Sequence, residues 1–171
     1  MLIGGPNLIG FIVLALLSLD ELPKADADGR IDPKKLAGIV VDDDQAETTG
    51  EWTKVSDDKP FVGSGYRVDP NQGKGRSKMK FTPDLPTAGK YRVKVIYPPG
   101  KNRPAQLQFV INGPQGITLV DFNQRDPKTP GRVQRLGVFR FAAGKRNWVE
   151  VNTRGADGTT AIDAIVFESV K

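Results

Sequence analysis

The chain has 171 residues, enough for one well-buried core, and it contains neither cysteine nor histidine. Disulfides, thiolate sites, Ser-His-Asp triads and histidine zinc sites are therefore excluded, so that any catalysis would rest on carboxylates, Lys, Tyr or Arg. The net charge is +5, and because residues 1–27 are slightly acidic, the rest of the chain is more basic still. A basic domain favours anionic partners such as acidic polysaccharide, although the charge also serves solubility.

The N-terminal segment, residues 1–27, begins with 19 uncharged residues and is expected to be helical. Three interpretations are open. A signal peptide fits the apolar run and the small residues Ala25 and Ala27. A membrane anchor would need about 20 apolar residues, and a remnant helix would pack on a preceding domain. Residues 28–37 are predicted as a linker and residues 38–171 as the globular domain.

Strand signals follow one another from residue 39, with turn residues between them. In residues 90–98, for example, Tyr91 and Val93 alternate with Arg92 and Lys94. The predicted strands lie within 39–41, 77–82, 90–98, 105–111, 117–123, 135–141, 147–152 and 161–169. Residues 53–77 are predicted to be irregular. Eight strands without an amphipathic helix predict an all-β fold, a two-sheet antiparallel sandwich.

Several stretches occur in the order found in a known module: IVVDDDQAETTGEW, GSGYR, FTPDLPTAGKYRVKVIYPPGKNR, LGVFRFAAG and AIDAIVF. Across residues 39–167 the chain resembles the golvesin C-terminal / xanthan lyase carbohydrate-binding-like domain. The resemblance implies a jelly-roll β-sandwich of the galactose-binding-like type. It also implies a non-catalytic accessory module of an exported bacterial enzyme, such as a lyase, hydrolase or oxidoreductase, with polysaccharide as its partner.

Two positions depart from that family. Many relatives have a tryptophan where this chain has Val133, Gln134 and Arg135, and a histidine in the hairpin that here carries Asn112-Gly113. A neutral-sugar platform at these positions is therefore disfavoured. An anion-binding face gains Arg132 and Arg135.

Three aspartates, Asp42, Asp43 and Asp44, follow the first strand of the domain, and Asp163 lies in the last. Calcium takes six to eight oxygen ligands, so Asp42, Asp43 and Asp163 are candidate ligands of a structural calcium ion. Alternation along a strand would point Asp43 away from its two neighbours. The alternative is that the triplet ends the strand and Asp163 accepts backbone N–H bonds or pairs with an arginine.

Aromatic and basic residues supply the candidate ligand contacts. A sugar ring stacks on aromatic side chains, and arginine pairs with carboxylates; the alternatives are core packing and internal pairing. The candidate ligand-binding residues are Trp52, Tyr66, Arg67, Asn102, Arg103, Gln124, Arg125 and Arg135, with Trp148, Lys101 and Asn123 as weaker ones.

No acid/base spacing or nucleic-acid-binding motif is recognisable, so neither catalysis nor nucleic-acid binding is expected. A membrane would be contacted only through residues 1–19. The alternative to a carbohydrate module is a structural or protein-interaction sandwich without a ligand of its own.

Overall fold

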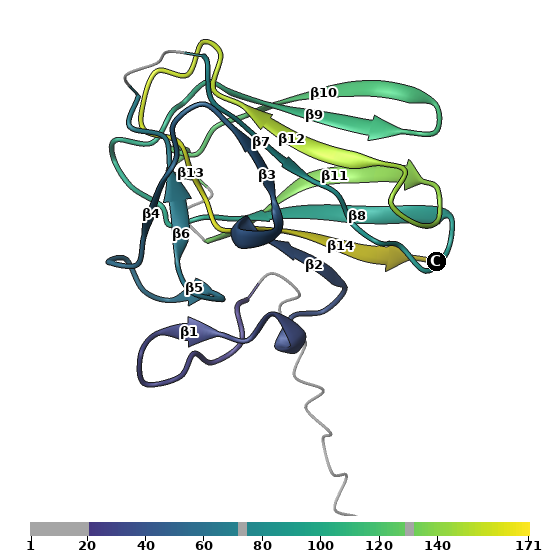
Figure 1. The fold of residues 1–171 in the computed structure, drawn as a ribbon, viewed down its shortest axis with the longest axis horizontal. Coiled ribbons are helices and arrows are strands. Elements are labelled where there is room, and N and C mark those ends of the chain that lie inside the picture. Colours follow the sequence, from purple (N-terminus) through teal and green to yellow (C-terminus); the bar gives the residue numbers. More distant parts are fainter. Residues whose placement is uncertain (1–20, 72–74, 129–131) are drawn as a thin grey trace, which may run out of the picture.

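The computed structural model describes residues 21–71, 75–128 and 132–171, and over these ranges it is a sandwich of two antiparallel sheets (Figure 1). This confirms the predicted all-β sandwich. The five-stranded sheet has the order β10 (Gly116–Phe122), β9 (Leu107–Gly113), β12 (Trp148–Asn152), β7 (Lys78–Phe81) and β3 (Glu47–Thr49). The four-stranded sheet has the order β11 (Val133–Phe141), β8 (Gly89–Ile96), β14 (Ala164–Val170) and β2 (Ile39–Asp42). The expected N-terminal helix lies outside the described residues.

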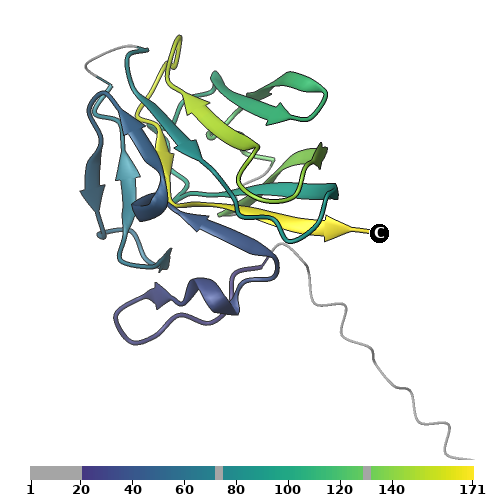
Figure 2. The ribbon, with the colours of Figure 1, turned by 45° about the vertical axis from the view of Figure 1, so that its right-hand side comes forward.

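The core lies between the two sheets, whose arrangement Figure 2 shows. Alternate residues of each strand point into this core. On β8, Tyr91 and Val93 are buried in the core, whereas Lys90 on the opposite face is exposed. Phe109 on β9 and Phe167 on β14 face the same core from the two sheets. The hydrophobic alternation thus decides which face of each sheet is buried.

The first and last strands of the sandwich are neighbours, because β2 pairs antiparallel with β14. Asp42 lies opposite Ala164 in this register. The pairing brings the aspartate triplet next to Asp163, as the calcium hypothesis requires.

Two smaller sheets close one end of the sandwich. One contains β13 (Ala161–Ile162), β6 (Tyr66–Val68) and β4 (Thr53–Val55), and the other pairs β1 (Arg30–Ile31) with β5 (Phe61–Val62) in parallel. The prediction of an irregular stretch at 53–77 is therefore wrong. Strands of two or three residues are too short to show an alternating pattern in the sequence.

Residues 28–37, predicted as a linker, contain β1 and the 3-10 helix η1 (Pro33–Lys35). Ile31 is buried, and Leu36 packs with Leu22 against the outer face of the four-stranded sheet. In Figures 1 and 2 this segment lies against the side of β2 and β14 that faces away from the core. This segment thus covers part of the outer face of the four-stranded sheet. In the part of the chain that the structure describes, no helix is long and apolar enough to cross a membrane.

A matched pair of substitutions tests the assignment of the sheet faces. Ile111 on β9 is 1% exposed, and Ile117 on the adjacent β10 is 54% exposed. We expect Ile111→Ala to lower the free energy of unfolding by about 2–5 kcal/mol because it leaves a cavity. Ile117→Ala should change it by less than about 0.5 kcal/mol. Urea unfolding followed by tryptophan fluorescence measures both, and equal losses would contradict the faces assigned here.

Candidate functional site

The aspartate triplet lies where β2 ends and the chain turns. Asp43–Gln45 form the 3-10 helix η2, and the Asp42 N–H donates a hydrogen bond to Gln45 Oε1 at 3.0 Å. The turn replaces the alternation of an extended strand. The expectation that Asp43 points away from its neighbours is therefore wrong, since one carboxylate oxygen from each of Asp42, Asp43 and Asp44 lies within 4.8 Å of the others.

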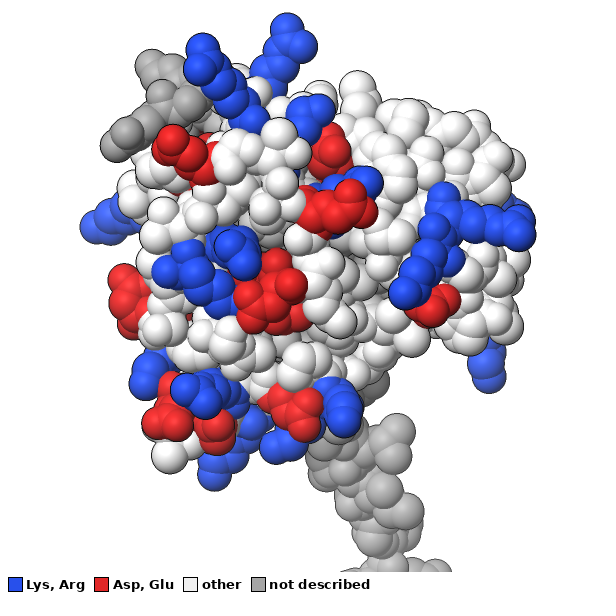
Figure 3. All heavy atoms as spheres, viewed as in Figure 1, with Lys and Arg blue, Asp and Glu red and all other residues white. Residues whose placement is uncertain are grey.

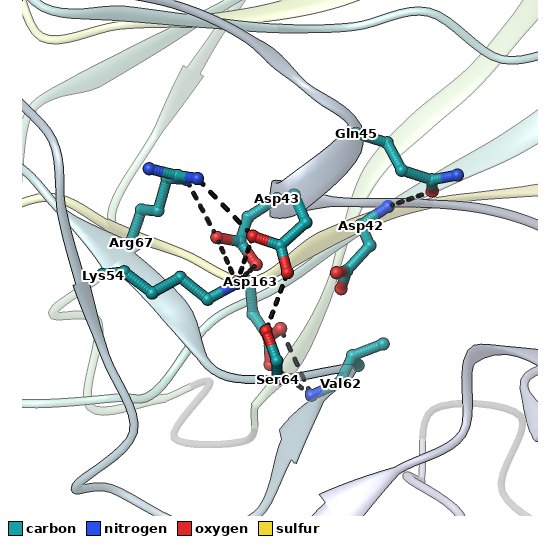
Figure 4. A network of polar contacts seen from close by, with 9 residues as sticks. Asp42, Asp43, Gln45, Lys54, Val62, Ser64, Arg67 and Asp163 are labelled. Carbon is teal, nitrogen blue, oxygen red and sulfur yellow. Dashed lines mark hydrogen bonds and ion pairs between the residues drawn. The ribbon is translucent and has the colours of Figure 1, made fainter.

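Two cations from the small three-stranded sheet meet this triplet (Figure 4). Lys54 Nζ on β4 lies 2.9 Å from Asp43 Oδ1 and 2.6 Å from Asp44 Oδ1. Arg67 Nε on β6 lies 3.1 Å from Asp43 Oδ2, without hydrogen-bond geometry. Ser64 Oγ donates to Asp44 Oδ2 at 2.7 Å. Arg67, predicted to bind a ligand, is thus engaged in an internal ion pair.

Asp163 is held by the backbone of a neighbouring strand. The Val62 N–H of β5 donates to its Oδ2 at 3.0 Å and to its Oδ1 at 3.2 Å. The contact matches the alternative interpretation, in which Asp163 accepts backbone hydrogen bonds. Burial nevertheless raises the pKa of this carboxyl group well above its usual range, because the charged form loses its hydration.

The other two buried carboxyl groups differ in their partners. Asp42 is buried and its Oδ1 has no hydrogen-bond partner, so burial, followed by the charge of Asp43, raises its pKa to about 7. Burial likewise raises the pKa of Asp43 to about 6, although the hydrogen bond from Lys54 opposes the shift. For the exposed Asp44, the hydrogen bonds from Lys54 and Ser64 lower the pKa instead.

A divalent cation would find suitable donors here, since calcium prefers carboxylate oxygens. The Lys54 ammonium group, however, already contacts oxygens of both Asp43 and Asp44. A metal ion would have to compete with this ammonium group for the same oxygens. The calcium site at Asp42, Asp43 and Asp163 stays untested, and the contacts of Lys54 favour an ammonium group as the counter-charge in place of a metal ion.

The two aromatic candidates face inward. Trp52 packs against the core, and its indole N–H donates to the Lys78 carbonyl oxygen at 3.0 Å. Tyr66 is buried, and its hydroxyl donates to Asp57 Oδ1 at 2.6 Å. Their sequence signal, an aromatic residue beside a polar loop, does not distinguish a stacking platform from a core residue. Both rings thus take part in packing and in internal hydrogen bonds, and their role in ligand binding stays a prediction.

The two predicted basic loops meet, but most of their polar side chains form bonds within the protein. Arg103 is buried, and its Nε donates to the Pro98 carbonyl oxygen at 2.9 Å. Gln124 is buried too and exchanges two hydrogen bonds with the backbone of Ala161, at 2.7 and 3.2 Å. Arg125 forms an ion pair with Asp157 at 2.8 Å, with both groups partly exposed. The exposed residues of these loops are Lys101, Asn102, Asn123 and Arg125.

The remaining candidates lie on the two outer sheet faces or beside them. Arg132 Nη2 donates to Asp58 and, at 2.9 Å, to the Lys59 carbonyl oxygen. Arg135 is exposed on β11. Trp148 is half-buried on β12, opposite Asn112 of β9. Of these three, Arg135 is the most accessible to a ligand.

A groove that the sequence did not indicate opens between the β9–β10 hairpin and β11. It has a volume of about 450 Å³ and is lined by Lys90, Ile111, Gly113, Gln115, Gly116, Thr118, Val138, Phe139 and Arg140. Binding grooves in proteins commonly combine apolar walls with a few polar groups in this volume range. Its lining combines cationic, amide, hydroxyl and apolar side chains, which suits a carbohydrate chemically.

Solved structures of carbohydrate-binding modules share the fold of this sandwich. The carbohydrate-binding module CBM35 from Paenibacillus barcinonensis superposes with a TM-score of 0.60 and 16% identity, over 78% of this chain and 100% of that one. A family 35 module from Clostridium thermocellum gives a TM-score of 0.56 and 17% identity, over 77% and 97%. At these identities the likeness concerns the fold.

The sequence comparison is more specific. The Golvesin C-terminal domain family matches residues 39–169, and the chain belongs to this family. Xanthan lyase from Bacillus sp. (strain GL1) is 32% identical over 153 residues, which are 85% of this chain and 16% of the lyase. The structure of Paenibacillus xanthan lyase has a TM-score of 0.72 and 26% identity, over 78% of this chain and 13% of the lyase. The chain thus spans a small part of the length of these relatives. The resemblance to the golvesin C-terminal / xanthan lyase domain, inferred from the sequence, is confirmed.

The raised pKa of Asp42 predicts a pH-dependent stability. A carboxyl pKa that is higher in the folded than in the unfolded state stabilises the fold at low pH, and this stability is lost as the pH rises towards 7. Asp42→Asn should therefore gain stability relative to the wild type between pH 5 and pH 8, by more than about 1 kcal/mol. Asp44→Asn is the control. Because the pKa of Asp44 is lowered, Asp44 stays ionised over this range, and the free energy of unfolding of Asp44→Asn should differ from that of the wild type by a constant amount. Urea titrations at the two pH values decide the matter, and a constant difference for Asp42→Asn would refute it.

The position of Lys54 leads to a prediction of how the aspartate triplet responds to calcium. In the wild type, calcium at roughly 1–10 mM or EDTA should leave the melting temperature unchanged, because the ammonium group already neutralises the carboxylates. Lys54→Ala should lower the free energy of unfolding at pH 8 by about 2 kcal/mol or more, since it leaves Asp43 buried without its main partner. Added calcium should restore part of this loss.

Lys80→Ala, which removes an ion pair with the exposed Glu47, is the matched control and should cost less than about 1 kcal/mol. Differential scanning fluorimetry with and without calcium measures the wild type, Lys54→Ala, Lys80→Ala and Asp42→Asn. Calcium-dependent melting of the wild type that disappears in Asp42→Asn would contradict the role assigned to Lys54 and would establish a calcium site.

Proposed function

We propose that this protein is a non-catalytic accessory module of an exported bacterial protein and that it holds an associated enzyme near polysaccharide. The observation that carries the proposal is the combination of Golvesin C-terminal family membership with a fold like that of whole CBM35 modules. Its relative xanthan lyase supports the association with an enzyme, since the matched region is 16% of that protein.

Acidic polysaccharide is the class of ligand that the charge favours. The chain carries 25 basic and 20 acidic residues and no histidine, so its positive charge persists across the physiological pH range. Much of the acidic side-chain charge near the aspartate triplet is already paired with Lys54 and Arg67. The basic side chains that exceed the acidic ones therefore lie on the surface away from the aspartate triplet.

A specific observation favours the second candidate, a structural domain that docks on a neighbouring protein domain. Ile117 and Leu119 on β10 are 54% and 58% exposed and lie on the outer face of the five-stranded sheet. Figure 3, drawn in the view of Figure 1, shows few charged atoms over the region of β9 and β10. Apolar side chains exposed side by side are typical of an interaction surface.

Affinity electrophoresis of the full chain separates the two candidates. We expect migration to slow in gels that contain xanthan or polygalacturonate, and to remain unchanged in gels with the neutral polymers dextran or glucomannan. Raising the salt concentration should weaken the effect, because it screens exposed charges. Incubation with the same polymers should release no reducing ends.

Unchanged mobility in every gel would contradict polysaccharide binding and favour the docking domain. Release of new chain ends by the purified protein would overturn its non-catalytic role. Bovine serum albumin, run alongside, controls for sieving by the polymer.

A further inference from the structure

Cations face one another across two strands on the outer face of the four-stranded sheet. In the antiparallel register of β8 and β11, Lys90 lies opposite Arg140 and Lys94 lies opposite Arg135. Arg92 lies between them on β8. Like charges directly opposite each other in adjacent strands destabilise a sheet. Folding alone would therefore not favour the juxtaposition of Lys90 and Arg140, whereas an anionic ligand would.

Glu168 on β14 supplies negative charge to one side of this basic row. Its carboxylate lies 2.6 Å from Lys94 Nζ and 3.4 Å from Arg92 Nη1. Lys94 is only 2% exposed, so its ion pair with Glu168 is internal. Within residues 21–71, 75–128 and 132–171, neither Lys90 nor Arg140 forms an ion pair, and both are exposed. The unbalanced charge thus concentrates at the Lys90–Arg140 end of the row.

This end of the row coincides with the groove between the β9–β10 hairpin and β11, since both Lys90 and Arg140 line it. Gln115 and Thr118 add an amide and a hydroxyl group from the hairpin. Val138 adds an apolar surface that is 49% exposed. The groove therefore offers charge, hydrogen-bonding groups and an apolar wall in one place.

Two glycines set the shape of this groove. A Cβ atom at Gly113 would lie 2.8 Å from the Arg140 carbonyl oxygen, so glycine lets the hairpin approach β11 closely. A Cβ atom at Gly137, whose φ is +150°, would lie 2.7 Å from Phe139 Cζ. The Phe139 ring thus lies over the backbone of Gly137 and lines the groove from β11.

We propose that this groove binds a sugar carboxylate of an anionic polysaccharide, with Arg140 and Lys90 as the anion-binding pair. The proposal rests on the proposed function and gives it a location. Arginine pairs with carboxylates through two parallel hydrogen bonds, and lysine adds a point charge. Gln115 and Thr118 bond the sugar hydroxyls, and Val138 and Phe139 contact the apolar face of the ring. Arg92 extends the positive surface to the next sugar along the chain.

The double variant Lys90→Ala/Arg140→Ala tests this site in xanthan and polygalacturonate gels. We expect its association constant, from mobility relative to a polymer-free gel, to fall at least tenfold. The matched control is Arg30→Ala/Lys34→Ala, which removes the same charge from two exposed residues outside the groove. The control should stay within twofold of the wild type. Melting temperatures confirm that each variant is folded.

Val138→Glu is a second variant, which places a negative charge beside Arg140 at an exposed position. It should weaken retardation as strongly as the double variant does. If both groove variants were retarded as strongly as the wild type, the site would be overturned while the proposed function stayed intact. A loss of retardation confined to Arg30→Ala/Lys34→Ala would overturn the site as well. Failure of the wild type to bind any polymer would instead overturn the proposed function itself.

Discussion

The buried carboxyl group of Asp163 is the point at which three sheets of this fold are joined. The residue separates β13, which belongs to the small three-stranded sheet, from β14, which belongs to the sandwich. Its carboxylate accepts hydrogen bonds from the Val62 N–H of β5, its backbone N–H donates to Ile96, and its carbonyl oxygen accepts from Asp43. A buried carboxyl group is costly without such partners. The end of the sandwich that carries β1, β4, β5, β6 and β13 depends on these bonds.

The polar bonds around Asp163 hold one end of the sandwich together, whereas the other end carries the open groove beside β11. Around Asp163, the charges of Asp43 and Asp44 are matched by Lys54 and Arg67, and Gln124 and Arg103 bond to backbone carbonyl groups. In the sequence these residues look like candidate ligand contacts, because they are polar and lie in or beside loops. Their bonds are internal, however, so they stabilise the arrangement of the loops. The groove beside β11 is lined by Lys90 and Arg140, for which the described part of the chain provides no ion-pair partner.

The sequence predicts the sandwich well, because each long strand buries alternate residues and the period is visible over seven or more positions, as in β8 and β14. It also suggests that Asp163 joins the aspartate triplet if the first and last strands are neighbours, and β2 does pair with β14. The short strands β4, β5 and β6 escape prediction, because two or three residues show no period. The partners of Trp52, Tyr66 and Arg103 depend on tertiary contacts between distant segments. The groove depends on the register of β8 with β11, which pairs Lys90 with Arg140, and on the bulge at Arg135–Gly137. An outward Lys-x-Arg-x-Lys pattern at residues 90–94 is the one sequence signal that points towards it.

Carbohydrate binding in the groove beside β11 can be followed through the backbone amide chemical shifts of the 15N-labelled chain during titration with an oligogalacturonate. Saturable shifts are expected at Gln115, Gly116 and Thr118 of the hairpin and at residues 138–140 of β11, all of which line the groove. Shifts confined to the loops at residues 99–103 and 123–126, with none beside β11, would contradict it.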